Sequence, residues 1–121
     1  FWKIMEKVKK TEILRERTSW DGVTLPDYPS GKPEIVSIRM EFPAGAKLPM
    51  HYHPVINFGI LEKGELTIIT LDGREKVLKA GEALVEMVET VHYGANRGTE
   101  TAVLTMFYLT TGKEEVTISA E

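Results

Sequence analysis

Most of the chain after residue 33 consists of short segments in which apolar and polar residues alternate. The clearest segment covers residues 36–42, where the apolar positions are Val36, Ile38, Met40 and Phe42. Because successive side chains of a strand point to opposite faces of a sheet, this alternation is typical of a half-buried β-strand. A surface helix would need a period near 3.6 instead. The pattern therefore restricts the chain to a fold that is built from strands.

Short turn sequences separate these segments at regular intervals. Further strand candidates cover residues 55–61, 65–71, 75–78, 83–88, 91–96 and 100–109, with breaks at Lys63-Gly64, Asp72-Gly73, Ala80-Gly81 and Arg97-Gly98. Asp-Gly between apolar strands favours a tight hairpin, because both central residues of a type I′ turn adopt positive φ. Regularly spaced short strands of this kind indicate an antiparallel barrel or sandwich. We predict an all-β fold, with a small antiparallel β-barrel domain over residues 34–121.

Residues 1–33 are less regular and are predicted to form an N-terminal arm that packs on the barrel. Residues 5–17 fit a short helix or an edge strand, and the weak alternation of residues 11–17 favours the strand. Residues 18–33 are rich in proline and glycine and contain two aromatic residues, Trp20 and Tyr28. Aromatic side chains are costly to leave in water, so we expect this ordered loop to cover part of the barrel.

Size and composition exclude several classes of protein. The 121 residues fit one domain, and the 42% apolar content supports a folded core. With a net charge of −3 and no long basic block, the chain is not expected to bind nucleic acid. Its apolar runs are too short to span a bilayer, so we predict a soluble protein without a membrane partner. The chain starts at Phe1, which leaves a cytoplasmic protein and an exported one without its signal peptide equally open.

The spacing of the three histidines points to a metal site. His51 and His53 are two residues apart in a strand context, so their imidazoles project from the same face of a sheet. His92 lies in a later strand candidate and can point to the same spot if the two strands are neighbours. The chain has no cysteine, so any ligands must be nitrogen or oxygen atoms. Three imidazoles suit one divalent transition metal, with Fe, Mn, Ni, Cu and Zn all open.

The glycines around these histidines match two motifs of the cupin superfamily in spacing. Gly45, His51, His53, Asn57 and Gly64 fit the first motif, in which a glutamate usually stands where this chain has Asn57. The chain therefore resembles a small single-domain cupin.

The second motif is matched by Gly81, His92 and Asn96. Here Met87 replaces the usual proline and Glu89 the usual glycine. The resemblance implies a double-stranded β-helix, or jelly-roll-like barrel, that holds one metal ion inside. By the same resemblance, His51, His53 and His92 are the expected ligands.

The role of Asn57 is left open by the sequence. It could be a fourth ligand, a partner of a metal-bound water, or a packing residue. A carboxylate would reduce the charge of a divalent site from +2 to +1, whereas an amide leaves it unchanged. A site with Asn57 should therefore favour an anionic guest.

Three acidic residues near the second motif are further candidates: Glu82, Glu86 and Glu89. Such residues usually lie on the wet face of a strand. Glu86 has the same parity as His92, which makes it the best of the three for a missing ligand or a catalytic base.

Three functions fit these features. The leading hypothesis is a metal-dependent enzyme with dioxygenase-like chemistry on a small organic, anionic molecule. A metal-dependent isomerase or lyase is a close variant. The alternative is a non-catalytic module that binds a sugar or carboxylate with weak metal binding or none. We also expect a homodimer, because the N-terminal arm could pair with a partner's sheet edge.

Overall fold

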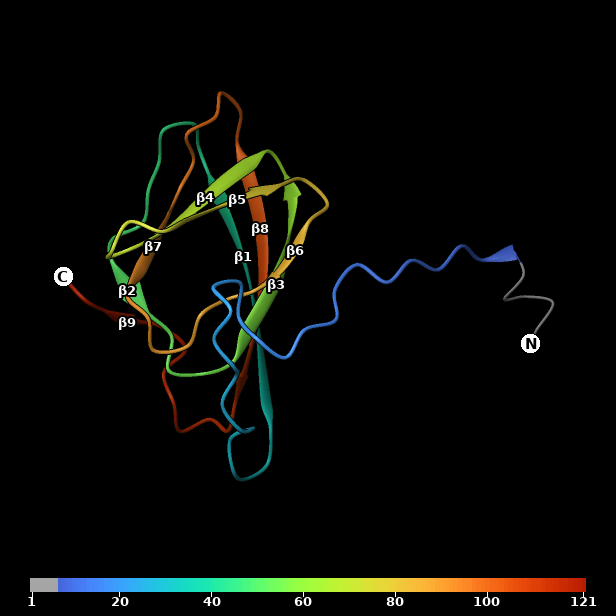
Figure 1. Ribbon diagram of the computed structural model, residues 1–121, viewed down its shortest axis with the longest axis vertical. Helices are drawn as coiled ribbons and strands as arrows, with labels where there is room; N and C mark the ends of the chain where they lie inside the picture. Colours follow the sequence, from blue (N-terminus) through green and yellow to red (C-terminus); the bar gives the residue numbers. More distant parts are fainter. Residues whose placement is uncertain (1–6) are drawn as a thin grey trace.

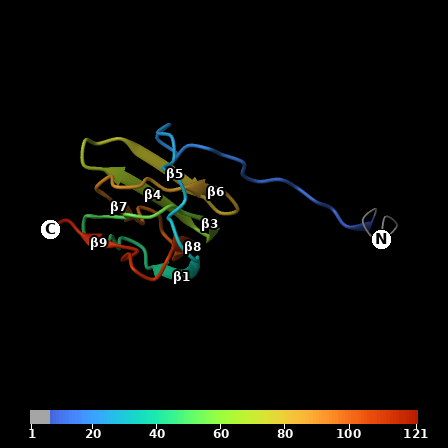
Figure 2. The same ribbon diagram turned by 90° about the horizontal axis from the view of Figure 1, so that it is seen from below.

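The computed structural model of the chain describes residues 7–121, so residues 1–6 of the predicted arm lie outside the described part. Its elements are strands arranged in two antiparallel sheets (Figures 1 and 2). The bounds are β1 Glu34–Phe42, β2 His51–Tyr52, β3 Asn57–Lys63, β4 Glu65–Thr70, β5 Glu75–Lys79, β6 Ala83–Val85, β7 His92–Ala95, β8 Ala102–Thr110 and β9 Ile118–Ser119. The predicted all-β fold is confirmed.

The four-stranded sheet has the order β1-β8-β3-β6 and contains the longest strands. β1 and β8 pair over their whole length, from Glu34 opposite Thr110 to Phe42 opposite Ala102. Buried residues alternate with partly exposed ones along all of β8, as the sequence pattern predicts. This sheet is therefore a continuous, regular wall on one side of the molecule.

The five-stranded sheet has the order β5-β4-β7-β2-β9. Its hairpin β4–β5 turns at Asp72-Gly73, where Gly73 has a positive φ but Asp72 does not, so the tight hairpin forms without the two positive φ angles of a type I′ turn. β2 and β9 are only two residues long each, and β9 was not predicted, because two residues are too few to show alternation.

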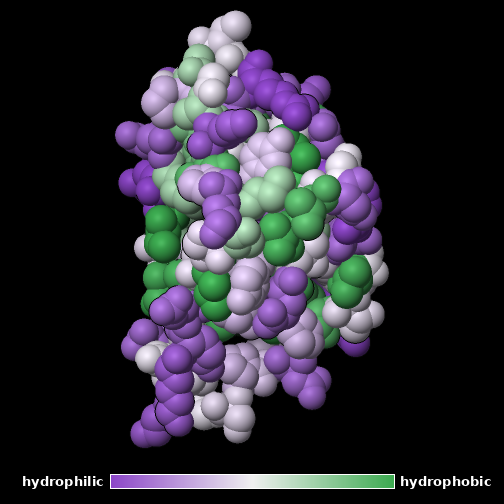
Figure 3. Space-filling view, turned by 90° about the vertical axis from the view of Figure 1, so that its left-hand side faces the viewer, coloured by the Kyte–Doolittle hydropathy of each residue, from purple (hydrophilic) through white to green (hydrophobic). Residues whose placement is uncertain are grey.

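The core lies between the two sheets. Its buried members include Phe42, Leu61, Leu66, Leu78, Leu84, Ala102, Leu104 and Met106. The sheets are not closed into one continuous barrel, so the expected barrel is a jelly roll of two facing sheets. On the side where β2, β7 and β9 lie, apolar patches interrupt the polar surface (Figure 3). No helix among the described residues has the length and apolar character needed to cross a membrane.

The N-terminal arm differs from the expectation. The edge strand predicted over residues 11–17 is not formed, and this segment runs outward from the sheets (Figures 1 and 2). A strand needs a hydrogen-bonded neighbour, and among the described residues this segment has a backbone partner only at its end, where the carbonyl of Arg17 accepts from the backbone nitrogen of Leu25. In the following loop, Trp20 packs against the core whereas Tyr28 is 80% exposed. Only one of the two aromatic residues therefore covers the barrel.

Candidate metal centre

The pairing of two short strands brings the histidines together. His51 opens β2 and lies directly opposite His92, the first residue of β7. His53 follows β2 two residues after His51, so its side chain returns to the same face. The register of one strand pair therefore sets the position of two of the three rings.

The three imidazole rings meet inside the protein. Their centroids are 5.0 Å apart for His51 and His53, 4.6 Å for His51 and His92, and 5.0 Å for His53 and His92. One nitrogen from each ring lies within 4.8 Å of the other two. Two nitrogens bound at about 2.1 Å to one ion can be at most about 4.2 Å apart. The cluster therefore has nearly the dimensions of a three-nitrogen metal site.

Backbone carbonyls fix the orientation of all three rings. Nδ1 of His51 lies 2.8 Å from the carbonyl oxygen of Pro49, and Nδ1 of His53 lies 2.8 Å from that of Val116. Nδ1 of His92 lies 2.7 Å from the carbonyl oxygen of Thr90. Because a carbonyl oxygen only accepts, each Nδ1 carries a hydrogen, and each neutral ring presents the lone pair of Nε2. This is the state in which an imidazole binds a metal.

Burial favours the neutral form of two of these rings. It lowers the pKa of His53 to about 4, and the nearby imidazoles contribute to this lowering. The hydrogen bond to Val116 acts in the opposite direction and raises the pKa, but it does not cancel the effect of burial. Burial also lowers the pKa of His51, against its bond to Pro49. Neutral imidazoles bind metal without first losing a proton, so the cluster is prepared for an ion at neutral pH.

The rings line a cavity of about 300 Å³ between the two sheets. Its remaining wall is mostly apolar and includes Met40, Leu66, Leu104 and Met106. No lysine or arginine is among its lining residues in the described part of the chain. An ion held by the three histidines would therefore be the positive charge of this cavity.

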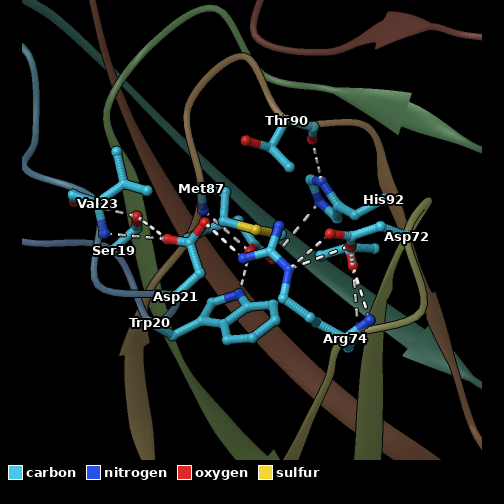
Figure 4. Close-up of polar contacts among 11 residues, drawn as sticks. Ser19, Trp20, Asp21, Val23, Asp72, Arg74, Met87, Thr90 and His92 are labelled. Atoms are coloured by element: carbon cyan, nitrogen blue, oxygen red, sulfur yellow. Dashed lines mark hydrogen bonds and ion pairs between the residues drawn. The ribbon is translucent and has the colours of Figure 1, made fainter.

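Glu86 lies in the same cavity, contrary to the usual position of such a residue on a wet strand face. Its Oε1 accepts hydrogen bonds from the indole nitrogen of Trp20 (2.8 Å) and the backbone nitrogen of Met87 (3.0 Å). Its Oε2 lies 3.5 Å from Nε2 of His92. Figure 4 shows Trp20, Met87 and His92 gathered around this point.

The other two acidic candidates lie elsewhere. Glu82 is exposed, and its carboxylate accepts a hydrogen bond from the backbone nitrogen of Lys79. Glu89 has a positive φ of 66° in the loop before β7, and neither residue lines the cavity. Both residues therefore lie outside the cavity.

Asn57 is fully buried at the start of β3. Its Nδ2 donates a hydrogen bond to the carbonyl oxygen of Val55, whereas its Oδ1 has no partner among the described residues. Asn57 does not line the cavity. The amide at this motif position thus has an oxygen without a partner, but it does not join the histidine cluster at the cavity wall.

Asn96 braces a turn. Its Nδ2 donates to the carbonyl oxygens of Phe42 and Glu100, and its Oδ1 accepts from the backbone nitrogen of Gly98. These bonds tie the end of β7 to the end of β1 and the start of β8.

Three further polar residues belong to the cavity wall: Tyr108, Thr117 and Ser119. Burial raises the pKa of Tyr108, and the nearby charge of Glu86 adds to the effect. Its inward position follows from the alternation of β8. For Thr117 and Ser119 the sequence has no comparable signal, because they lie at the short β9.

Comparisons with known proteins agree with this geometry. The family model described as "Cupin domain" matches residues 38–108, more than half of the 121 residues. No curated protein matches the chain significantly.

Solved structures share the fold. A double-stranded β-helix protein from Klebsiella pneumoniae is 21% identical, with a TM-score of 0.62 over 78% of this chain and 90% of its own. Oxalate oxidase in complex with the substrate analogue glycolate is 23% identical (TM-score 0.61), over 71% of this chain and 46% of its own. Salicylate 1,2-dioxygenase from Pseudoaminobacter salicylatoxidans is 15% identical (TM-score 0.55), over 61% of this chain and 22% of its own. This chain thus spans less than half the length of these two enzymes.

Proposed function

The chain belongs to the cupin family, and on this basis we propose that it binds one divalent transition metal through His51, His53 and His92 and acts on a small organic anion. The observation that carries the proposal is the convergence of three buried imidazoles whose Nδ1 atoms are all held by carbonyl oxygens. Such a ligand set leaves coordination positions open for a substrate.

The cavity defines what that substrate can be. A volume of about 300 Å³ admits only a small molecule, and the apolar walls exclude water from the reacting group. Since no lysine or arginine lines the cavity in the described part, a single anionic group next to the metal is the charge that fits. The metal would supply Lewis-acid or redox chemistry to a group bound beside it.

We propose dioxygenase-like oxidation as the reaction. Two of the solved structures with this fold are described as an oxalate oxidase and a salicylate dioxygenase, both oxidative enzymes for small carboxylates. Another solved structure with this fold is described as a DMSP lyase from Ruegeria pomeroyi. Isomerase or lyase activity is therefore the second reaction to be tested.

Elemental analysis tests the metal centre. The purified protein should contain close to one transition-metal ion per chain, and both His51→Ala and His92→Ala should lose it. Asn57→Ala is the control, because its amide lies outside the cavity wall and should leave the metal content nearly unchanged. A parent that takes up no metal even when soaked in Fe, Mn, Ni, Cu and Zn salts would refute the proposal.

A non-catalytic binding module is the alternative that the cavity also supports. Besides the histidines, Glu86 and Tyr108 are the only ionisable groups of its described lining. Oxygen consumption by the Fe(II)-loaded protein, measured with a panel of small carboxylates, diketones and flavonols, separates the two functions. Tight binding of an unreacted carboxylate without oxygen uptake would favour the module.

We also propose a homodimer that uses the outer face of the four-stranded sheet. Phe58 and Phe107 stack there with centroids 5.8 Å apart, and Ile35 is exposed on the same face. A groove of about 460 Å³ runs between this face and the arm. The arm itself extends outward with Val8 and Ile13 exposed (Figure 2). Apolar surface of this kind is typical of an interface between subunits.

Light scattering tests this assembly. We expect twice the chain mass of 13.6 kDa, and a shift towards the single mass for Phe107→Ser combined with Ile13→Glu. A parent protein with the mass of one chain at micromolar concentration would contradict the dimer.

A further inference from the structure

Glu86 has one oxygen that is fully engaged and one that is not. Trp20 and Met87 both donate to Oε1, which fixes the carboxylate in the cavity wall. Among the described residues, no hydrogen bond to Oε2 is formed, and the nearest ring nitrogen is Nε2 of His92, 3.5 Å away. The hydrogen of that neutral ring lies on Nδ1 and is donated to the carbonyl oxygen of Thr90, so Nε2 presents a lone pair to the carboxylate and not a donor.

Metal binding would leave this oxygen without a donor. When the lone pair of Nε2 of His92 binds an ion, the ring still offers no hydrogen to Oε2 of Glu86. A buried oxygen without a donor is costly, so a group that enters the cavity beside the ion gains affinity if it brings a hydrogen for this oxygen. The carboxylate is therefore a free acceptor for a group that binds beside the ion.

Resting on the metal-dependent function proposed above, we infer that Glu86 selects the substrate. It does so by accepting a hydrogen bond from a hydroxyl or amino group that is carried next to the metal-binding carboxylate of the substrate. The expected class is small 2-hydroxy or 2-amino acids, because a simple carboxylate leaves Oε2 unpartnered. Trp20 is the positioning residue, since its indole hydrogen holds the acceptor in place from the N-terminal loop (Figure 4).

The Co(II)-loaded protein makes this measurable without turnover. Its visible absorption is titrated with two matched pairs of acids, glycolate against acetate and lactate against propionate. Each pair has the same charge and differs by one hydroxyl group. A hydroxy acid can also bind the metal through its hydroxyl, so the informative quantity is the change in the affinity ratio between variants.

Glu86→Gln should lower this ratio about tenfold or more. Its carbonyl oxygen can keep the bonds to Trp20 and Met87, but its amide nitrogen then faces the substrate and cannot accept the hydrogen. Trp20→Phe should lower the ratio about threefold, because the ring remains while the indole hydrogen is lost. Glu82→Gln is the matched control, with the same change of charge at an exposed position, and should leave the ratio unchanged.

The metal content of the parent and of the Glu86→Gln variant distinguishes a failure of this inference from a failure of the proposed function. If the parent takes up Co(II) and Glu86→Gln keeps both the metal and the parent's ratio, the selective role of Glu86 is refuted and the metal centre stands. If Glu86→Gln loses the metal, Glu86 is a ligand rather than a selector, and the inference is also refuted. If the parent binds no Co(II), the proposed function itself fails.

Discussion

The two sheets face the same cavity but contribute to it in different ways. The five-stranded sheet supplies His51 and His92 from strands of two and four residues. The four-stranded sheet supplies apolar wall residues and Tyr108 from strands of nine residues. The histidines thus lie on short, locally braced segments, whereas the opposite wall is built on long strands.

This difference shows where precision comes from in the molecule. Each histidine on the short strands is oriented by a carbonyl oxygen close to it in space, so its ring does not depend on a long ladder of backbone bonds. The long strands instead depend on close backbone contact between neighbours. Substitutions in the two sheets should therefore have different consequences for stability and for metal binding.

The largest effect is expected at Gly59 in β3 of the four-stranded sheet. A Cβ atom there would lie 2.1 Å from the carbonyl oxygen of Thr105 and 2.4 Å from the Sδ of Met106. Because backbone oxygen cannot move aside cheaply, Gly59→Ala should lower the free energy of unfolding by about 3 kcal/mol or more. Urea denaturation of the metal-free protein measures this.

Gly94→Ala is the matched control in the five-stranded sheet. Its Cβ would lie 3.8 Å from the side chains of Leu66 and Phe42, which is an ordinary contact distance. We expect its stability to stay within about 1 kcal/mol of the parent. Equal losses for the two variants would show that the contrast between the sheets is wrong.

The next prediction concerns the loss of stability at low pH, which should arise from the buried histidines. In the folded, metal-free protein the pKa of His53 is lowered to about 4, mainly by burial, and that of His51 is lowered for the same reason. The unfolded chain binds protons near pH 6.5, whereas the folded chain does not, so stability falls as the pH drops from 6.5 towards 4. The loss due to His53 should reach about 3 kcal/mol at pH 4.

Urea unfolding at several pH values in the presence of a chelator measures this loss. His53→Gln removes the titrating ring and should flatten the dependence between pH 6.5 and pH 5. An unchanged slope in that variant would mean that burial does not keep the ring of His53 neutral.

Much of both sheets could be predicted from sequence. Alternation located β1, β3, β4 and β8, the spacing of His51 and His53 predicted a common face, and the resemblance to the two cupin motifs added His92. These predictions depend on short-range periodicity, which a sequence displays directly. The register of β2 against β7 then needs only one pair of residues to bring the rings together.

The rest depended on contacts between distant segments. Trp20 and Glu86 are 66 residues apart, and no periodic pattern links them. The parity of Glu86 with His92 is not the physical reason for its burial, because Glu89 interrupts the extended chain with a positive φ. Conversely, the alternation in residues 11–17 was misleading, since a strand forms only where a neighbouring strand edge is available.

The smallest expected effect concerns the loop that carries Trp20 and Asp21. The pKa of Asp21 lies below its usual range: partial burial raises it, but bonds from Ser19 and Val23 and the charged bond from Arg74 outweigh burial. Nη1 of Arg74 is 3.3 Å from Oδ2 of Asp21, so β4–β5 hold the residue next to Trp20 (Figure 4).

Arg74→Met should therefore lower the free energy of unfolding only slightly, because the half-exposed arginine is screened by solvent. Arg97→Met is the control: it removes an exposed ion pair with Glu75 that does not touch the loop, and it should have a smaller effect. If Arg74→Met also lowers the preference of the Co(II)-loaded protein for glycolate over acetate, the loop transmits its position to Glu86 through Trp20. If stability falls and the preference stays, the hydrogen bond from Trp20 holds the carboxylate without help from the five-stranded sheet.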